Sequence, residues 1–160
     1  MATSGPTIHD QLKEISANNV RVMQENFKQY KSKVQSLKPK DGQTPEPGWE
    51  KLINEEAAKE KTRNDEAIAT STKEIVATIE KLPPKEREPA AKHWVSLQQI
   101  LMRYLAKIGH MILQVADAVI NWVEGAWDKV EEAAEEVASW TKQTLESIAG
   151  SFVGSSGGGR

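Results

Sequence analysis

The chain of 160 residues is 38% hydrophobic and 28% charged, which suits one domain with a modest apolar core. It has no cysteine, so a disulfide framework and thiolate catalysis are excluded, and a reducing compartment fits. The formal net charge of −2 argues against a general binder of nucleic acid or another polyanion.

The first residues, Met-Ala-Thr-Ser-Gly-Pro, carry neither the basic nor the apolar region of a signal peptide. We therefore expect a cytoplasmic protein, or one released without a signal peptide. We expect no permanent transmembrane segment, because Arg103, Lys107 and Asp117 interrupt the most apolar stretch of the chain. A span needs about 20 mainly apolar residues.

A first amphipathic helix is predicted to begin after Thr7. Threonine is a good N-cap, and Asp10 three residues later completes a variant of the capping box. Apolar residues then recur every three or four positions, as on one face of a helix: Ile8, Leu12, Ile15, Val22, Met23, Phe27, Tyr30, Val34 and Leu37. Pro39 and Gly42 end this helix, and the proline-rich segment 44–48 predicts a rigid connection.

A second helix is predicted from about Trp49 to Leu82. Apolar residues concentrate at its two ends, whereas its middle, residues 58–66, is almost entirely charged or small. Such a helix needs neighbours on its flanks, or it frays. Pro83 and Pro84 end it, because proline lacks the backbone N–H and clashes with the preceding turn.

The third helix is predicted to begin at Pro89, to run to about Asn121 and to contain the most apolar stretch of the chain. A start at Pro84 would place Pro89 beyond the first turn, where its ring clashes with an upstream carbonyl. Proline is favourable in the first turn of a helix, so we place Pro89 there. Gly125 is the expected site of a break or bend.

A fourth helix is predicted from Ala126 to Ala149, with Gly150 as its C-cap. No alternation typical of a strand occurs, so the predicted fold is all-α. We expect an antiparallel, four-helix-bundle-like arrangement of three long helices and a C-terminal helix, with coiled-coil contacts and the third helix central. Residues 1–153 are expected to form one domain, and the glycine-serine tail 154–160 is expected to be disordered.

The two ends of the chain carry opposite charge. Basic residues dominate the first helix: Lys13, Arg21, Lys28, Lys31, Lys33, Lys38 and Lys40. Acidic residues dominate the last: Glu124, Asp128, Glu131, Glu132, Glu135, Glu136 and Glu146. We expect the two stretches to lie side by side, with each surface pair worth at most about 1 kcal/mol. The alternative is a basic patch for anionic lipid or nucleic acid.

The third helix carries the strongest signal in the sequence, a narrow line of polar residues that we call the polar seam. Its members are Arg103, Lys107, His110, Gln114, Asp117 and Asn121. At 100° per residue they fall within an arc of about 80°. The remainder of the helix between residues 100 and 123 is apolar apart from Gly109, so its apolar arc is unusually wide.

Three interpretations of this arc remain open. The third helix is the centre of a bundle, or it also mediates self-association, or its apolar arc meets lipid when the bundle opens. The candidate residues for contact with a partner or a membrane are Trp94, Leu101, Tyr104, Ile108, Ile112, Val119, Trp122 and Trp127. Trp94 and Trp122 would lie about 42 Å apart on a straight helix, close to the thickness of a bilayer with its headgroups. Trp127 points away from the face shared by Trp122 and Trp140, so we expect Trp127 to be exposed or to lie in an interface.

Catalytic and metal-binding patterns are not evident. The histidines His9, His93 and His110 do not pair at metal-ligand spacing, and no Gly-rich phosphate loop follows a strand. We therefore expect no enzyme, no cofactor and no metal site. If His110 is packed in the third helix beside Lys107, its protonation would loosen that packing near pH 6.

Together these features predict a non-enzymatic protein-interaction module or self-associating scaffold that uses the helix around 94–123. The alternative is a membrane-active bundle that inserts this helix conditionally, as a pore-forming or membrane-perturbing protein does. The expected partner is a protein or a second copy of the chain, with an anionic membrane surface as the alternative. We do not expect nucleic acid.

Overall fold

The structure, a computed structural model, describes residues 7–40 and 43–158, with side chains as far as Ser151. The described chain forms four helices and no strand: α1 (Ile8–Ser36), α2 (Trp49–Glu80), α3 (Pro84–Ile120) and α4 (Ala126–Gly158). The predicted all-α fold is therefore confirmed, with helices packed against one another as a bundle.

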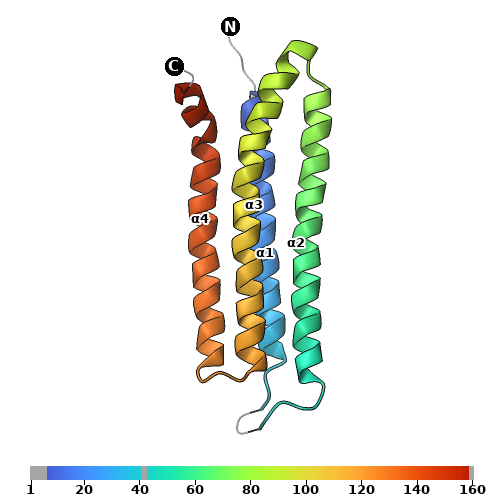
Figure 1. Ribbon diagram of the computed structural model, residues 1–160, viewed down its shortest axis with the longest axis vertical. Coiled ribbons are helices and arrows are strands. Elements are labelled where there is room, and N and C mark those ends of the chain that lie inside the picture. The colour runs from blue at the N-terminus through green and yellow to red at the C-terminus, as the bar shows by residue number, and fades with distance from the viewer. Residues whose placement is uncertain (1–6, 41–42, 159–160) are drawn as a thin grey trace.

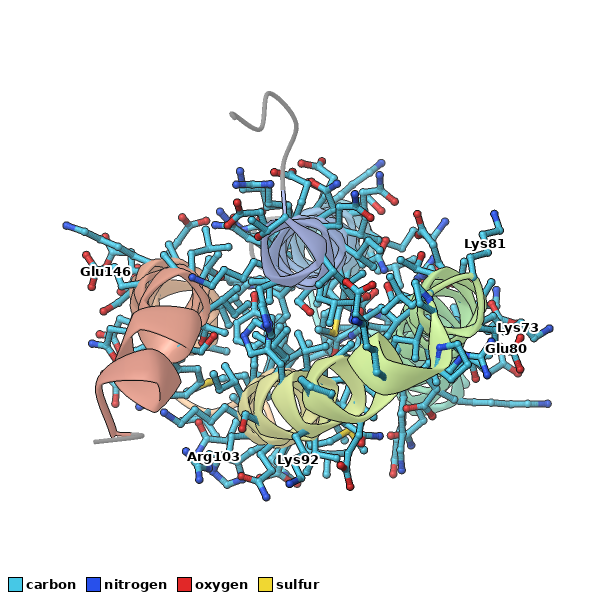
Figure 2. The ribbon with its side chains drawn as sticks, turned by 90° about the horizontal axis from the view of Figure 1, so that it is seen from above. Lys73, Glu80, Lys81, Lys92, Arg103 and Glu146 are labelled. Atoms are coloured by element: carbon cyan, nitrogen blue, oxygen red, sulfur yellow. The ribbon has the colours of Figure 1, made fainter. Side chains whose placement is uncertain are left out.

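The four helices run alternately up and down, so that both ends of the described chain lie at the same end of the bundle (Figure 1). Seen from above, they form a diamond in which α1 faces α3 across the centre and α2 and α4 occupy the outer corners (Figure 2). Helices α1 and α3 contact each other and both outer helices, whereas α2 and α4 make no contact in the described residues. The third helix is central, as predicted, and it shares that position with α1.

The start of α1 agrees with the sequence. Thr7 is the N-cap, and its hydroxyl accepts a hydrogen bond from the backbone N–H of Asp10 at 3.1 Å. The Asp10 carboxylate accepts the N–H of Thr7 in return, at 3.4 Å, which completes the capping box. The predicted N-cap at Thr7 and its capping box are therefore confirmed.

The first connection brings the start of α2 back to the end of α1. Gly48, the residue before α2, has φ +89°, a conformation that glycine adopts without strain. The indole N–H of Trp49 donates to the carbonyl of Leu37 at 3.0 Å. This bond fixes a tryptophan at the end of the bundle where the α1–α2 and α3–α4 connections lie (Figure 1).

The start of α3 differs from the prediction. The helix begins at Pro84, which occupies its first position, and Pro89 lies inside it. The first turns are exposed to solvent, so the carbonyl that loses its partner at Pro89 can bind water, and these turns lean toward α2 (Figure 1). Arg87 stabilises the connection between α2 and α3, because its guanidinium donates to the carbonyls of Leu82 at 2.9 Å and Glu80 at 3.3 Å. The predicted start at Pro89 was wrong because solvent exposure makes an internal proline tolerable.

The break between α3 and α4 lies where the sequence predicts it. Helix α3 ends at Ile120, and Gly125 adopts φ +72° immediately before α4. The far end of α4 differs, because the helix passes through Gly150 and continues to Gly158. Just past Gly150, the hydroxyl of Ser151 donates to the carbonyl of Ile148 at 2.9 Å and lies 3.1 Å from His93 Nε2. Residues 154–158, predicted to be disordered, are thus helical, and residues 159 and 160 lie outside the described chain.

The core is a continuous apolar column that α1 and α3 supply with most of its large side chains. The largest buried members are Tyr30, Tyr104, Phe27, Leu12, Met23, Ile53, Ile75, Leu97, Leu101, Ile108 and Ile148. The two buried tyrosine hydroxyls are paired: Tyr30 donates to the carbonyl of Ile112 at 3.0 Å, and Tyr104 lies 2.6 Å from the hydroxyl of Thr141. These bonds tie α1 to α3 and α3 to α4.

The oppositely charged helices α1 and α4 pack side by side, as predicted. Lys31 Nζ lies 3.0 Å from Glu131 Oε2, and the amide of Gln35 donates to Glu131 Oε1 at 2.7 Å. The Gln35 amide, followed by the Lys31 charge, lowers the pKa of the Glu131 carboxyl. The contact is exposed, so it orients the helices more than it stabilises them.

Candidate functional site

Most of the apolar residues that the sequence suggests for partner or membrane contact face the core of the bundle. They are Trp94, Leu101, Tyr104, Ile108, Ile112 and Val119, and all of them are buried. Helices α1, α2 and α4 cover this part of α3 because the apolar arc is wide enough to meet all three. In this conformation these side chains are inaccessible to a partner.

The polar seam is exposed along the outer face of α3, on the side of α4. Two of its pairs bond internally, with Asn121 donating to Asp117 Oδ1 at 2.7 Å and Gln114 Nε2 lying 2.9 Å from His110 Nε2. Lys107 Nζ lies 5.5 Å from the centre of the Trp140 ring on α4. His110 is exposed rather than packed, so the predicted role of its protonation in loosening the bundle has no structural basis.

Beside the polar seam lies a second feature, which we call the outer line of α3. Val95, Met102 and Leu113 are 51%, 46% and 65% exposed. At about 100° per residue the three side chains point within about 20° of one another. Small residues, Ala106 and Gly109, fill the line between Met102 and Leu113. The sequence alone does not single out this line, because its residues belong to a wider apolar arc. Only the packed structure shows which residues of that arc remain exposed.

Three tryptophans from separate parts of the chain meet at the end of the bundle that holds the α1–α2 and α3–α4 connections. The centres of the Trp49 and Trp122 rings are 5.6 Å apart, and those of Trp122 and Trp127 are 6.3 Å apart, both in edge-to-face contact. Lys38 Nζ lies 5.8 Å from the centre of the Trp127 ring. We call this group, with the exposed Leu52 and Val123, the tryptophan end.

Trp122 is the exposed member of this group. Trp122 is 44% exposed, whereas Trp127, which was expected to be exposed or in an interface, is half-buried. Trp122 also has φ +54°, a left-handed backbone conformation that is a strained outlier for a bulky residue. The tight turn between α3 and α4 imposes this conformation, with the N–H of Val123 bonded to the carbonyl of Ala118 at 3.0 Å. The turn therefore holds a large aromatic side chain at the surface.

The opposite end of the bundle contains a histidine pair that the sequence did not reveal. His9 Nδ1 and His93 Nδ1 lie 2.8 Å apart, and His93 Nε2 lies 3.1 Å from the hydroxyl of Ser151. Lys13 Nζ donates to the carbonyl of Ala149 at 2.7 Å. Burial, followed by the charges of His9 and Lys13, lowers the pKa of His93 to about 4. The pair joins α1, α3 and α4, and the separation of its members along the chain explains why spacing alone missed it.

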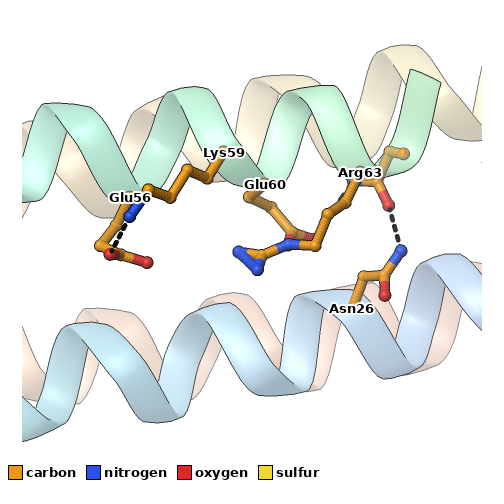
Figure 3. Close-up of polar contacts among 6 residues, drawn as sticks. Asn26, Glu56, Lys59, Glu60 and Arg63 are labelled. Atoms are coloured by element: carbon orange, nitrogen blue, oxygen red, sulfur yellow. Dashed lines mark hydrogen bonds and ion pairs between the residues drawn. The ribbon is translucent and has the colours of Figure 1, made fainter. Parts of the chain in front are cut away.

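A buried polar layer separates α1 from the middle of α2 (Figure 3). Glu60 is fully buried and accepts a hydrogen bond from the Asn64 amide at 3.2 Å, and Asn26 of α1 donates to Asn64 at 3.2 Å. Arg63 Nε lies 3.4 Å from Glu60 Oε1, and Lys59 Nζ lies 3.6 Å from Glu56. Burial raises the pKa of Glu60 to about 7, against the opposing effect of Asn64 and Arg63.

A groove of about 430 Å³ lies beside this layer, between α1 and α2. It is lined in part by Asn18, Asn26 and Ser71. The amide of Asn19 and the hydroxyl of Ser16 are buried nearby with no hydrogen-bond partner among the described residues. Solvent does not reach these atoms, so a molecule in the groove cannot bond to them unless the helices move. The layer is therefore a weak point of the packing rather than a built ligand site.

Neither the metal-binding nor the membrane-spanning geometry appears in the described residues. In the ranges 7–40 and 43–158, no three histidine, aspartate or glutamate side chains gather where they could hold a metal ion. Within the same ranges, none of the helices combines the length and the apolar character needed to cross a membrane. The arrangement offers surfaces for contact, and six of the eight exposed large apolar residues in the described chain belong to the tryptophan end or the outer line.

Comparison with known proteins adds no further assignment. No protein-family model matches this chain, and neither a curated protein nor a solved structure is significantly similar to it.

Proposed function

We propose that this protein is a non-enzymatic interaction module whose binding surface for another protein is the tryptophan end. The observation that carries the proposal is Trp122, 44% exposed at the tip of a rigid bundle. Tryptophan is the residue type most enriched among those that dominate the energy of protein interfaces. An exposed tryptophan that is also held in a strained backbone conformation is costly to keep without a use.

The surroundings of Trp122 favour binding. Its ring rests against Trp49 and Trp127, so little side-chain freedom is left to lose when a partner covers it. Leu52 and Val123 are exposed at the same end and extend the apolar area. Charged residues such as Lys38 surround it and supply the polar rim that protein interfaces commonly have.

Membrane perturbation is the competing function, and the burial of the apolar candidates on α3 argues against it. Lipid could reach Leu101, Ile108 or Val119 only if the bundle opened, because all three are fully buried. The charges near the tryptophan end are mixed, with Lys38 balanced by Glu50 and Asp128, so an anionic surface gains little there. A protein partner requires no opening.

Quantitative co-purification from the native source tests the proposal. The bait variants are Trp122→Asn, in which asparagine tolerates the left-handed backbone, and Leu113→Ser, which removes an exposed apolar group elsewhere. We expect one or more proteins to be retained by wild type and by Leu113→Ser and to fall about tenfold or more with Trp122→Asn. Equal retention by all three baits would reject the tryptophan end as the binding surface.

Vesicle binding decides between the two functions. We expect wild type neither to bind nor to permeabilise vesicles of neutral or anionic phospholipid at pH 5 to 8. Permeabilisation that disappears in Trp122→Asn would instead assign the tryptophan end to a membrane surface.

A further inference from the structure

The outer line of α3 has a symmetry along the helix that matches a second copy of itself. Val95 and Leu113 are equally distant from position 104, and so are Met102 and Ala106, and Gln99 and Gly109. If a second α3 lies antiparallel on the first, with a twofold axis at position 104, each large apolar side chain of the outer line faces a different residue of the second copy, and the facing residues complement each other in size. Val95 meets Leu113 of the second copy, and Met102 meets the small Ala106.

One pair of opposite charges fits the same register. Lys92 and Asp117 lie on the flank of the outer line, with their midpoint within half a residue of position 104. The antiparallel arrangement therefore places Lys92 beside Asp117 of the second copy, twice in each pair of molecules. Lys92 projects outward from α3 (Figure 2), and neither residue belongs to an ion pair within the described chain. In a parallel pair the two Lys92 side chains would lie on opposite flanks of the contact, and neither would lie beside Asp117.

We propose that the protein forms a weak antiparallel dimer in which the outer lines of two α3 helices pack against each other. The large side chains of the outer line are exposed, so a second copy can approach them without disturbing the bundle. Because one helix packs on one helix, the buried area is below that of a stable dimer, and dimerisation is concentration-dependent. The dimer carries its two tryptophan ends at opposite ends of an elongated body, where they can bridge two partners.

This proposal stands independently of the proposed function, since no residue of the tryptophan end takes part in the contact. Sedimentation equilibrium from micromolar to about 1 mM protein measures the association. We expect wild type and Trp122→Asn to dimerise alike and Leu113→Ser to weaken dimerisation about tenfold or more. A wild-type protein that remains monomeric throughout this range overturns the proposal.

A charge exchange tests the register. Lys92→Glu alone turns two attractive contacts into two repulsive ones, so we expect about tenfold weaker dimerisation. Adding Asp117→Lys to the same chain restores opposite charges, and we expect it to recover the wild-type association. If the double variant dimerises no better than Lys92→Glu, the antiparallel register is wrong.

The absence of cysteine makes a distance measurement straightforward, because single cysteines can carry spin labels at exposed positions. Ser96, Lys107 and Gln114 lie on the flank of α3 on the α4 side, away from the contact line. With 1.5 Å of rise per residue, the antiparallel dimer separates equivalent labels along the axis by about 24 Å at position 96, 9 Å at 107 and 30 Å at 114. Double electron–electron resonance on Ser96→Cys, Lys107→Cys and Gln114→Cys should give this order. Equal distances at the three positions would mean a parallel pair and would overturn the proposal.

Discussion

At the scale of single residues, two buried ionisable groups decide how stability depends on pH. Glu60 lies between α1 and α2, where it faces Tyr30 of α1 and its own neighbours Glu56, Arg63 and Asn64. His93 lies at the other end of the bundle, facing His9 and Lys13. Burial is the main cause of both pKa shifts, and the two shifts act on stability in opposite directions.

Glu60 should destabilise the bundle above neutral pH. Its folded-state pKa, about 7, lies above the ordinary 4.5, so its contribution to stability is complete below pH 4.5 and is lost as pH rises to about 7. We expect Glu60→Gln, which keeps an acceptor for Asn64, to gain up to about 3 kcal/mol at pH 8 and little at pH 4.5. Urea unfolding at the two pH values measures this. A gain of the same size at both values would contradict the assignment.

His93 should act at lower pH. Its folded-state pKa, about 4, lies below the ordinary 6.5, so the stability tied to its neutral form is complete above pH 6.5 and is lost as pH falls through 4. In wild type, protonation of His93 should lower the free energy of unfolding by up to about 3 kcal/mol as the pH falls. We expect the His93→Gln variant to lack this decrease, whatever its own stability at pH 7. The comparison of unfolding free energies between pH 7 and pH 4 in the variant and wild type provides the check. An unchanged difference would show that another group is responsible.

At the scale of helices, the internal proline of α3 is the clearest local conflict. Pro89 removes one backbone hydrogen bond six residues into the helix, whereas Pro84 occupies the first position, where no bond is lost. We expect Pro89→Ala to stabilise the bundle, by about 1–3 kcal/mol, and Pro84→Ala to have almost no effect. Thermal unfolding of both variants tests this, and a destabilised Pro89→Ala protein would show that the bend of α3 is needed for its packing on α2.

The helices themselves could be predicted because their signals are local. The capping box at Thr7, the double proline after Leu82 and the glycine at Gly125 each act on backbone within one turn. The continuation of α4 was not predicted, because a glycine at position 150 is typical of a C-cap, whereas Gly150 lies inside the helix. Local sequence also overestimated the effect of Pro89, since it does not show whether the affected turn faces solvent.

The candidate site could be predicted only in part, because it is built from contacts between distant residues. The sequence singled out Trp122, but its neighbour Trp49 comes from the start of α2, and only the antiparallel packing brings the two rings together. The wide apolar arc on α3 suggested uncovered surface, yet most of that arc is used within the bundle. What remains uncovered is the outer line, which becomes visible once the positions of α2 and α4 are known.

At the scale of the whole molecule, α1 and α3 form a spine with different chemistry at its two ends. One end holds the histidine pair and the other the tryptophan end, while the polar layer between α1 and α2 contains buried polar atoms without a hydrogen-bond partner. Between about pH 4.5 and 6.5 the opposite contributions of Glu60 and His93 to stability offset each other.

In the proposed function, a partner binds the tryptophan end while the bundle stays closed. The five indole N–H groups report on this directly, because Trp49, Trp94, Trp122, Trp127 and Trp140 lie in different environments. The measurement is a nuclear magnetic resonance titration of ¹⁵N-tryptophan protein with the partner retained by wild type. We expect the signals of Trp122 and its two ring neighbours to shift, while those of Trp94 and Trp140 stay in place. A shift of Trp94, which is buried in the core, or an unchanged Trp122 would contradict it.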